Sequence, residues 1–250
     1  MRSSVSLFVA AVALGLSGCA TDDAGSGELS GLPEPEPSVA VDDAISGVGP
    51  TGFPGVDLPI PAEARSVAVT FECDGGEPFS LELGDSMMLG QAPLSGTCDG
   101  ESELTWPITA KTGPTLGVFV ADGVAWVATT EFSTDEFVVD AALTSDCTRF
   151  SDVYSALLNA DTGYTQYNAF DETEWALRVD AASAELEDLA NTAESSLREE
   201  FARMSRAVSD PTRAVGSAVT TAAAQELTGP IGEACAVNQT PVIIQSEFGG

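Results

Sequence analysis

The spacing of apolar residues changes once along this chain and divides it into two kinds of secondary structure. Between residues 65 and 140, apolar and polar side chains alternate, as at 67–71 and 79–83. A period of two is typical of strands with one buried face. From residue 147 onward, the apolar positions recur every three or four residues, which is typical of amphipathic helices. We therefore predict an α+β protein of two units: a small antiparallel β-sandwich at 65–140 and a three-helix hairpin or bundle at 141–237.

The first nineteen residues have the features of an export signal. Arg2 precedes an apolar run at 5–16, and Leu16-Ser17-Gly18-Cys19 ends the segment. The run is too short to span a bilayer, which takes about 20 residues. The four-residue ending resembles the lipobox of bacterial lipoproteins. This resemblance implies that residues 1–18 are a signal peptide that is removed, and that Cys19 carries a diacylglyceryl group. An ordinary signal peptide with a chance cysteine is the alternative.

The segment at 19–64 is rich in Gly, Pro, Ser and acidic residues and has no sustained apolar period. That composition predicts a disordered, lipidated tether, which the Pro-Glu run at 33–37 extends. Residues 47–52 match the pattern G-x-G-x-x-G. A dinucleotide site needs a strand before this pattern and a helix after it, and neither is predicted, so nucleotide binding is not expected.

The five cysteines predict two disulfides. Cys73 and Cys98 are the only cysteines of the strand unit, and Cys147 and Cys235 are the only ones of the helical unit. Because an exported chain meets an oxidising environment, we predict that each pair is bonded and staples its own unit. Cys19 is left over, which agrees with its expected lipidation.

Proline and glycine predict how the strands connect. Pro107 lies in the apolar run at 104–108 and indicates an edge strand, because proline donates no hydrogen bond to a neighbouring strand. Asp122-Gly123 separates two further runs, which predicts that those strands form a tight hairpin. Two more turns are predicted at Cys73-Asp74-Gly75 and Cys98-Asp99-Gly100.

Capping residues and breakers set the bounds of the predicted helices. The first helix begins with Ser145 or Asp146 as its cap. The second spans 171–208, a stretch without Gly or Pro, and the third spans 211–228. Gly229-Pro230 is expected to end the third helix.

The unequal lengths of these helices predict how they pack. The first and third are each about half as long as the second, so each is expected to run antiparallel along one half of it. This layout brings Cys147 and Cys235 together near the middle of the second helix. The tail at 238–250 contains the apolar run Val242-Ile243-Ile244, which is expected to pack on one of the two units.

Charge and composition exclude several classes of function. The chain has 39 Asp and Glu against 9 Lys and Arg, so its surface repels phosphate backbones and nucleic acid is not a partner. It has no histidine, which excludes Ser-His-Asp and Cys-His catalysis and histidine-ligated metals. An enzyme that uses two carboxylates stays open. The basic residues are eight Arg and the single Lys111, a bias that often follows a GC-rich genome, and a salt-adapted organism would also be this acidic.

Two candidate binding sites emerge from the sequence. A disulfide between Cys73 and Cys98 would bring Asp74 and Asp99 together, and a weak Ca²⁺ site there is one interpretation because hard cations prefer oxygen ligands. The other is that Asp-Gly simply forms turns, with no cofactor.

The second candidate site lies where the chain passes from the first predicted helix to the second. Its aromatic residues either form a surface that binds a solute, a glycan or a peptide, or close the end of the helical hairpin. They are Tyr164, Tyr167, Phe170 and Trp175.

The predicted function is that of a lipid-anchored protein on the extracytoplasmic face of the cell membrane. Two stapled units on a long tether are better suited to display than to catalysis, so we expect a non-enzymatic protein that acts through protein or envelope contacts. The arrangement resembles that of many lipoproteins of high-GC Gram-positive bacteria. The alternative is a solute-, glycan- or peptide-binding module that uses the four aromatic residues.

Overall fold

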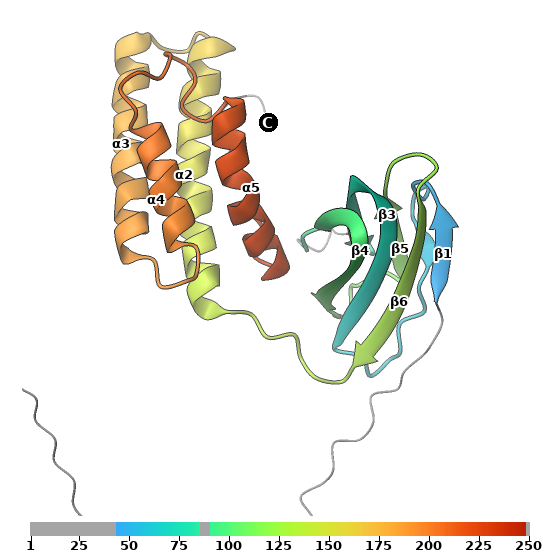
Figure 1. Ribbon diagram of the computed structural model, residues 1–250. Helices are drawn as coiled ribbons and strands as arrows, with labels where there is room; N and C mark the ends of the chain where they lie inside the picture. The colour runs from blue at the N-terminus through green and yellow to red at the C-terminus, as the bar shows by residue number, and fades with distance from the viewer. Residues whose placement is uncertain (1–43, 86–90, 249–250) are drawn as a thin grey trace, which may run out of the picture. The chain divides into compact units, whose positions relative to one another are not determined.

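The computed structural model describes residues 44–85 and 91–248 of the chain (Figure 1). It is an α+β structure in which the described residues form a curled antiparallel sheet of six strands and four helices. The strands are β1 (Ile45–Val48), β2 (Val56–Asp57), β3 (Ser66–Leu83), β4 (Leu94–Pro107), β5 (Thr115–Phe119) and β6 (Ala125–Ser133). The helices are α2 (Ala141–Thr165), α3 (Glu172–Thr192), α4 (Arg198–Val208) and α5 (Ala222–Val237).

The long strand β3 organises the sheet. One edge of β3 pairs with β4, and the other edge pairs with two strands: residues 66–73 with β6 and residues 80–83 with β5. The prediction of separate turns at the two Cys-Asp-Gly sequences was wrong, because β3 and β4 continue through them. The two sequences lie opposite each other, next to a shift in register between Asp74 and Pro78. Pro107 is the last residue of β4, where its missing N–H removes little pairing.

The predicted hairpin at Asp122-Gly123 was also wrong. The chain does turn there, with Gly123 at a φ of 81°. However, β5 and β6 do not pair with each other but with different halves of β3. The reason is the length of β3, which offers one edge to both strands, so the turn carries the chain from one half to the other.

The sheet begins at Ile45, well before residue 64, where the tether was predicted to end. β1 pairs with β6, and β2 pairs with β5, although both come from the segment 19–64. Gly47 lies against the ring of Trp126, where a Cβ atom would be 2.5 Å from Cζ2 of the indole. Trp126 donates a hydrogen bond of 2.9 Å from Nε1 to the carbonyl of Gly49. The glycines therefore serve sheet packing, while Cys19 and the signal segment lie outside the described residues.

Both predicted disulfides are confirmed. Cys73 and Cys98 join β3 to β4 within the apolar core of the sheet, and their Cα atoms are 4.7 Å apart. Cys147 and Cys235 join α2 to α5, with Cα atoms 5.8 Å apart. Each pair staples the part of the molecule in which it was predicted.

Several bounds of the helices differ from the prediction. The cap of α2 is Asp140 rather than Ser145 or Asp146, because the Asp140 side chain accepts from the amides of Ala142 and Leu143. The long predicted helix begins as expected, with Asp171 accepting from the amide of Glu174. It is then interrupted between Thr192 and Arg198, so that α4 folds back along α3 (Figure 1).

The third predicted helix was misplaced along the chain. Residues 211–221 precede α5, which is capped by Thr221 and continues through Pro230 to Val237. Proline removes one hydrogen bond within a helix, but burial of Ile231 and the disulfide at Cys235 stabilise the turns that follow it. The predicted layout holds in part, since α2 packs against α3, and α5 packs against α4. None of the described helices is both long and apolar enough to cross a membrane.

Candidate functional site on helix α2

Helix α2 holds three irregular segments of the chain through polar side chains. Four of these side chains are almost completely buried, although polar residues on a helix surface normally face solvent. Each accepts a hydrogen bond from a backbone amide of another segment, as buried polar groups require a partner. They are Asp146, Ser151, Ser155 and Asp161.

Asp146 stabilises the interruption between α3 and α4. Its Oδ2 accepts hydrogen bonds from the amides of Glu194 at 3.1 Å and Ser195 at 2.9 Å. On the other side of the interruption, Nε of Arg198 donates to the carbonyl of Ala193 at 2.9 Å. The chain therefore leaves the helix without Gly or Pro, because a carboxylate from α2 replaces the lost helical hydrogen bonds.

Asp161 holds the segment that precedes α5. The carboxylate is fully buried and accepts from Nε1 of Trp175 at 3.0 Å. It also accepts from the amides of Ala218 and Val219, each at 2.9 Å. Three donors to one carboxylate give this residue a structural role in anchoring the loop.

The C-terminal tail is bound to α2 as an extended peptide. The amides of Ile243 and Gln245 donate to the hydroxyls of Ser151 at 3.2 Å and Ser155 at 2.9 Å. The amide of Glu247 donates to Oδ1 of Asn159 at 2.9 Å, and Nδ2 of Asn159 donates back to the carbonyl of Gln245 at 2.7 Å. The tail predicted to pack on either unit therefore packs on the helices.

The spacing of these contacts has a geometric reason. Ser151, Ser155 and Asn159 are four residues apart, so they rise about 6 Å from one to the next along the helix. Alternate residues of an extended chain are about 6.6 Å apart. Successive turns of α2 therefore match alternate amides of the tail, and we define Ser151, Ser155 and Asn159 as the polar ladder.

Beyond the polar ladder, the end of the tail contacts one cation and two aromatic rings. Nη1 of Arg178 lies 2.8 Å from Oε2 of Glu247, and Nε of Arg178 lies 2.9 Å from Oε1 of Glu174. Hydrogen bonds to Glu174 and Glu247 raise the pKa of Arg178 above its ordinary value. Phe248 stacks on Tyr167 with ring centroids 5.6 Å apart and meets Phe170 edge-on at 6.0 Å.

The four predicted aromatic residues lie in two different environments. Trp175 is buried, and its ring centroid is 6.3 Å from that of Tyr164. Tyr167 is 49% exposed and, with Phe170, contacts the tail rather than an open pocket. The structure thus brings Tyr167 and Phe170 together with Phe248, which the sequence reasoning missed, and turns Trp175 toward the core.

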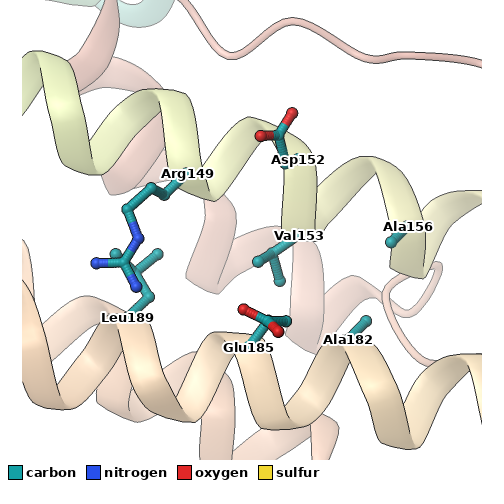
Figure 2. Close-up of a pocket in the computed structure, with 7 residues that line it drawn as sticks. All are labelled: Arg149, Asp152, Val153, Ala156, Ala182, Glu185 and Leu189. Carbon is teal, nitrogen blue, oxygen red and sulfur yellow. The ribbon is translucent and has the colours of Figure 1, made fainter.

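A shallow groove runs between α2 and α3 beside the tail. One cavity of about 270 Å³ lies between the two helices, and Figure 2 shows the side chains of Arg149 and Glu185 reaching into the space there. An adjoining cavity of about 540 Å³ is floored by small residues, including Ala156 and Ala182, and bordered by the tail at Gln245. The tail therefore covers only part of the surface between the two helices.

The candidate cation site in the sheet gains no support. Asp74 and Asp99 do lie opposite each other in β3 and β4, as the predicted disulfide implied, and both are exposed. Yet within residues 44–85 and 91–248 no group of three or more Cys, Asp or Glu side chains is placed to hold a metal ion.

The sequence reasoning missed the polar ladder, Asp161 and the tail contacts. The ladder did leave a signal, because Ser151, Ser155 and Asn159 recur every four residues along one helix. Asp161 left none among the 39 acidic residues of the chain. Comparison with protein families, with curated proteins and with solved structures finds no significant match to this chain.

Proposed function

We propose that this protein is a lipid-anchored, non-enzymatic protein of the extracytoplasmic face of the cell membrane, and that it acts through contacts with other envelope proteins. The observation that carries the proposal is the ending Leu16-Ser17-Gly18-Cys19 after an apolar run. Four of the five cysteines are bonded in pairs, which leaves Cys19 for another role. Disulfides persist mainly in oxidising compartments, which agrees with export.

The anchor would act through the acyl chains attached at Cys19. Each buried methylene contributes about 0.8 kcal/mol, so that one chain binds reversibly, while two or more hold a protein at the membrane. The acidic chain is repelled by anionic head groups, which supports a role in which lipid, rather than surface charge, provides attachment.

The finer architecture predicted from the sequence belongs to this proposal as well. We interpret the curled sheet as a β-sandwich and the helices as a bundle, each a unit with its own staple. Separate apolar clusters support this interpretation, one centred on Phe71 and Trp106 and the other on Phe150 and Phe201. Limited proteolysis tests it, because cleavage confined to residues 134–140 should yield two fragments that each resist further digestion.

The runner-up function is a binding module for a solute, a glycan or a peptide. Phe248 stacks on the face of Tyr167 and meets Phe170 edge-on, so the observation favours a peptide over a sugar at these rings. Both candidate functions, contact with other proteins and peptide binding, would therefore use the same surface of α2 and α3.

A Cys19→Ser variant tests the anchor. Cells that express the unaltered chain should carry it in the membrane fraction, released by detergent and not by high salt, and should label it with an alkyne analogue of palmitate. The variant should lose the label and leave the detergent-soluble membrane fraction. A variant that keeps both the label and the membrane attachment would contradict the proposal. Gln166→Ala is the control, since it changes an exposed residue at the end of α2 and leaves the lipobox and both disulfides intact.

A further inference from the structure

Most of the central contacts of the tail are made by its backbone, and the one central side chain that binds α2 is Gln245, which donates from Nε2 to Oδ1 of Asp152 at 2.9 Å. The polar ladder binds three backbone amides and two backbone carbonyls of residues 243–247. Recognition of this kind accepts any extended segment whose side chains avoid steric conflict, because the hydrogen-bonding groups are common to all peptides. The polar ladder is therefore a site for an extended peptide as a class.

Specificity comes from the two residues at the end of the tail. Arg178 binds the carboxylate of Glu247, and Tyr167 with Phe170 receives the ring of Phe248. An ion pair between partly exposed groups contributes little to affinity but selects charge and register. The site therefore favours a segment in which an acidic residue is followed directly by an aromatic one.

Residues 243–248 begin with little apolar burial. Ile243 is 62% exposed and Ile244 is 40% exposed, whereas Val242 before them packs against the helical core. The cavity of about 540 Å³ beside Gln245 also stays open. Hydrogen bonds that are exchanged against water add little net affinity, so another segment can compete for the site.

We propose that the polar ladder, together with Arg178, Tyr167 and Phe170, binds an extended peptide of a partner protein in place of residues 243–248. The ligand carries an acidic residue followed by an aromatic residue, with a bulky apolar side chain at the Gln245 position to fill the open cavity. This inference rests on the proposed function, because the partner meets the site at the outer face of the membrane. The tail then acts as a built-in competitor that lowers the apparent affinity of the site.

Peptide binding to the lipid-free chain of residues 20–250 tests the proposal without depending on the anchor. The probe is a fluorescent peptide with the sequence of residues 241–250, and the readout is anisotropy. A Glu247→Gln/Phe248→Ala variant weakens the tail in place, so the probe should bind it about tenfold more tightly than the unaltered chain. A probe with the Gln245→Leu change exchanges an exposed hydrogen bond to Asp152 for apolar burial in the cavity, and it should bind more tightly still.

Two controls locate the binding. Adding Asn159→Ala to the tail variant should reduce probe affinity about tenfold, since the probe loses two hydrogen bonds there, whereas Gln166→Ala at the exposed end of α2 should leave affinity unchanged. On the unaltered chain, saturating probe should speed hydrogen exchange at the amides of Ile243, Gln245 and Glu247. This second measurement needs no variant that has to fold.

Three results would overturn the proposal. One is equal affinity of the probe for the unaltered chain and the tail variant, and another is no binding to either together with unchanged exchange in the tail. The third is a dimer of the unaltered chain in light scattering that dissociates when probe is added, because it would assign the site to the tail of a second copy. Loss of lipidation in cells would affect none of these measurements, so failure of the two proposals can be told apart.

Discussion

The sheet and the helices satisfy their backbone groups in different ways. In the sheet, strand pairing supplies the hydrogen bonds, and Ser66 and Thr130 are the buried polar residues of the described strands. In the helical part, the segments around 193–197, 209–221 and 238–248 are not helical, and buried or partly buried side chains of α2 bind their backbones. Regular pairing thus organises the sheet, whereas one helix organises the rest.

The two disulfides differ in the same sense. Cys73 and Cys98 are 25 residues apart and join neighbouring strands that already pair with each other. Cys147 and Cys235 are 88 residues apart and join the first of the four described helices to the last. The helical part is therefore held by contacts between residues far apart in the sequence, whereas the sheet is held by pairing between adjacent strands.

The largest difference between the two parts should come from removing each disulfide. Loop-closure entropy predicts that Cys147→Ala/Cys235→Ala lowers the free energy of unfolding by about 4.6 kcal/mol, against about 3.5 kcal/mol for Cys73→Ala/Cys98→Ala. Urea titration followed by circular dichroism at the helical band and by tryptophan fluorescence measures both. A greater loss of unfolding free energy in the Cys73→Ala/Cys98→Ala variant would contradict this difference between the two parts.

Removing the carboxylate of Asp161 should cost nearly as much. Asp161→Ala leaves the indole N–H and two buried amides without an acceptor, and we expect a loss of about 3 kcal/mol in the free energy of unfolding. Asp152→Ala on the exposed side of the same helix is the control and should change stability by about 0.5 kcal/mol or less. Equal effects of the two variants would show that burial of the carboxylate does not matter.

A substitution at Gly47 tests the corresponding tight contact in the sheet. Gly47→Ala places a Cβ atom against the ring of Trp126, so we expect a loss of about 2 kcal/mol. Gly52→Ala meets no neighbouring atom within 4 Å and serves as the control. Thermal melting distinguishes them, and a melting temperature for Gly47→Ala that matches the control would refute the contact.

The smallest effect is expected at Asp210, which acts only within its own turn. Hydrogen bonds from the hydroxyl and then the amide of Thr212 lower the pKa of this exposed carboxyl. Because the pKa is lower in the folded state, the ionised carboxyl stabilises the fold above the unfolded pKa of about 3.9. This stabilisation is lost as the pH falls through the folded pKa. The stability difference between the unaltered chain and Asp210→Asn should therefore vanish in acid, and one that grew below pH 4 would contradict this sign.

The sequence predicts well what local pattern or simple counting decides. Period-two runs locate β5 and β6 to within a few residues, whereas β3 joins two of the predicted runs and β4 begins at Leu94, well before the run at 104–108. Two cysteines in each part leave only one pairing inside it. The start of α3 follows from Asp171, whose side chain accepts from the amide of Glu174 three residues later. These features need no knowledge of distant neighbours.

Features that depend on distant neighbours could not be predicted. The interruption after α3 contains no helix breaker, and its stabilising carboxylate, Asp146, is 48 residues away from Glu194 along the chain. β1 lies within a stretch rich in Gly and Pro, and Gly47 suits a strand only because Trp126 lies against it. In the candidate site, the aromatic residues were visible in the sequence, but the tail that covers them was not.

Native-state hydrogen exchange tests most directly the claim that α2 holds the irregular segments of the helical part. The amides of Ala218 and Val219, bound by the buried Asp161, should exchange far more slowly than those of an unfolded peptide. The amides of Ile243, Gln245 and Glu247, bound by the polar ladder, should be protected to a lesser degree. Asp161→Ala should remove protection at Ala218 and Val219 and leave β3 unchanged. Exchange of these amides at unfolded rates in the unaltered chain would contradict the account.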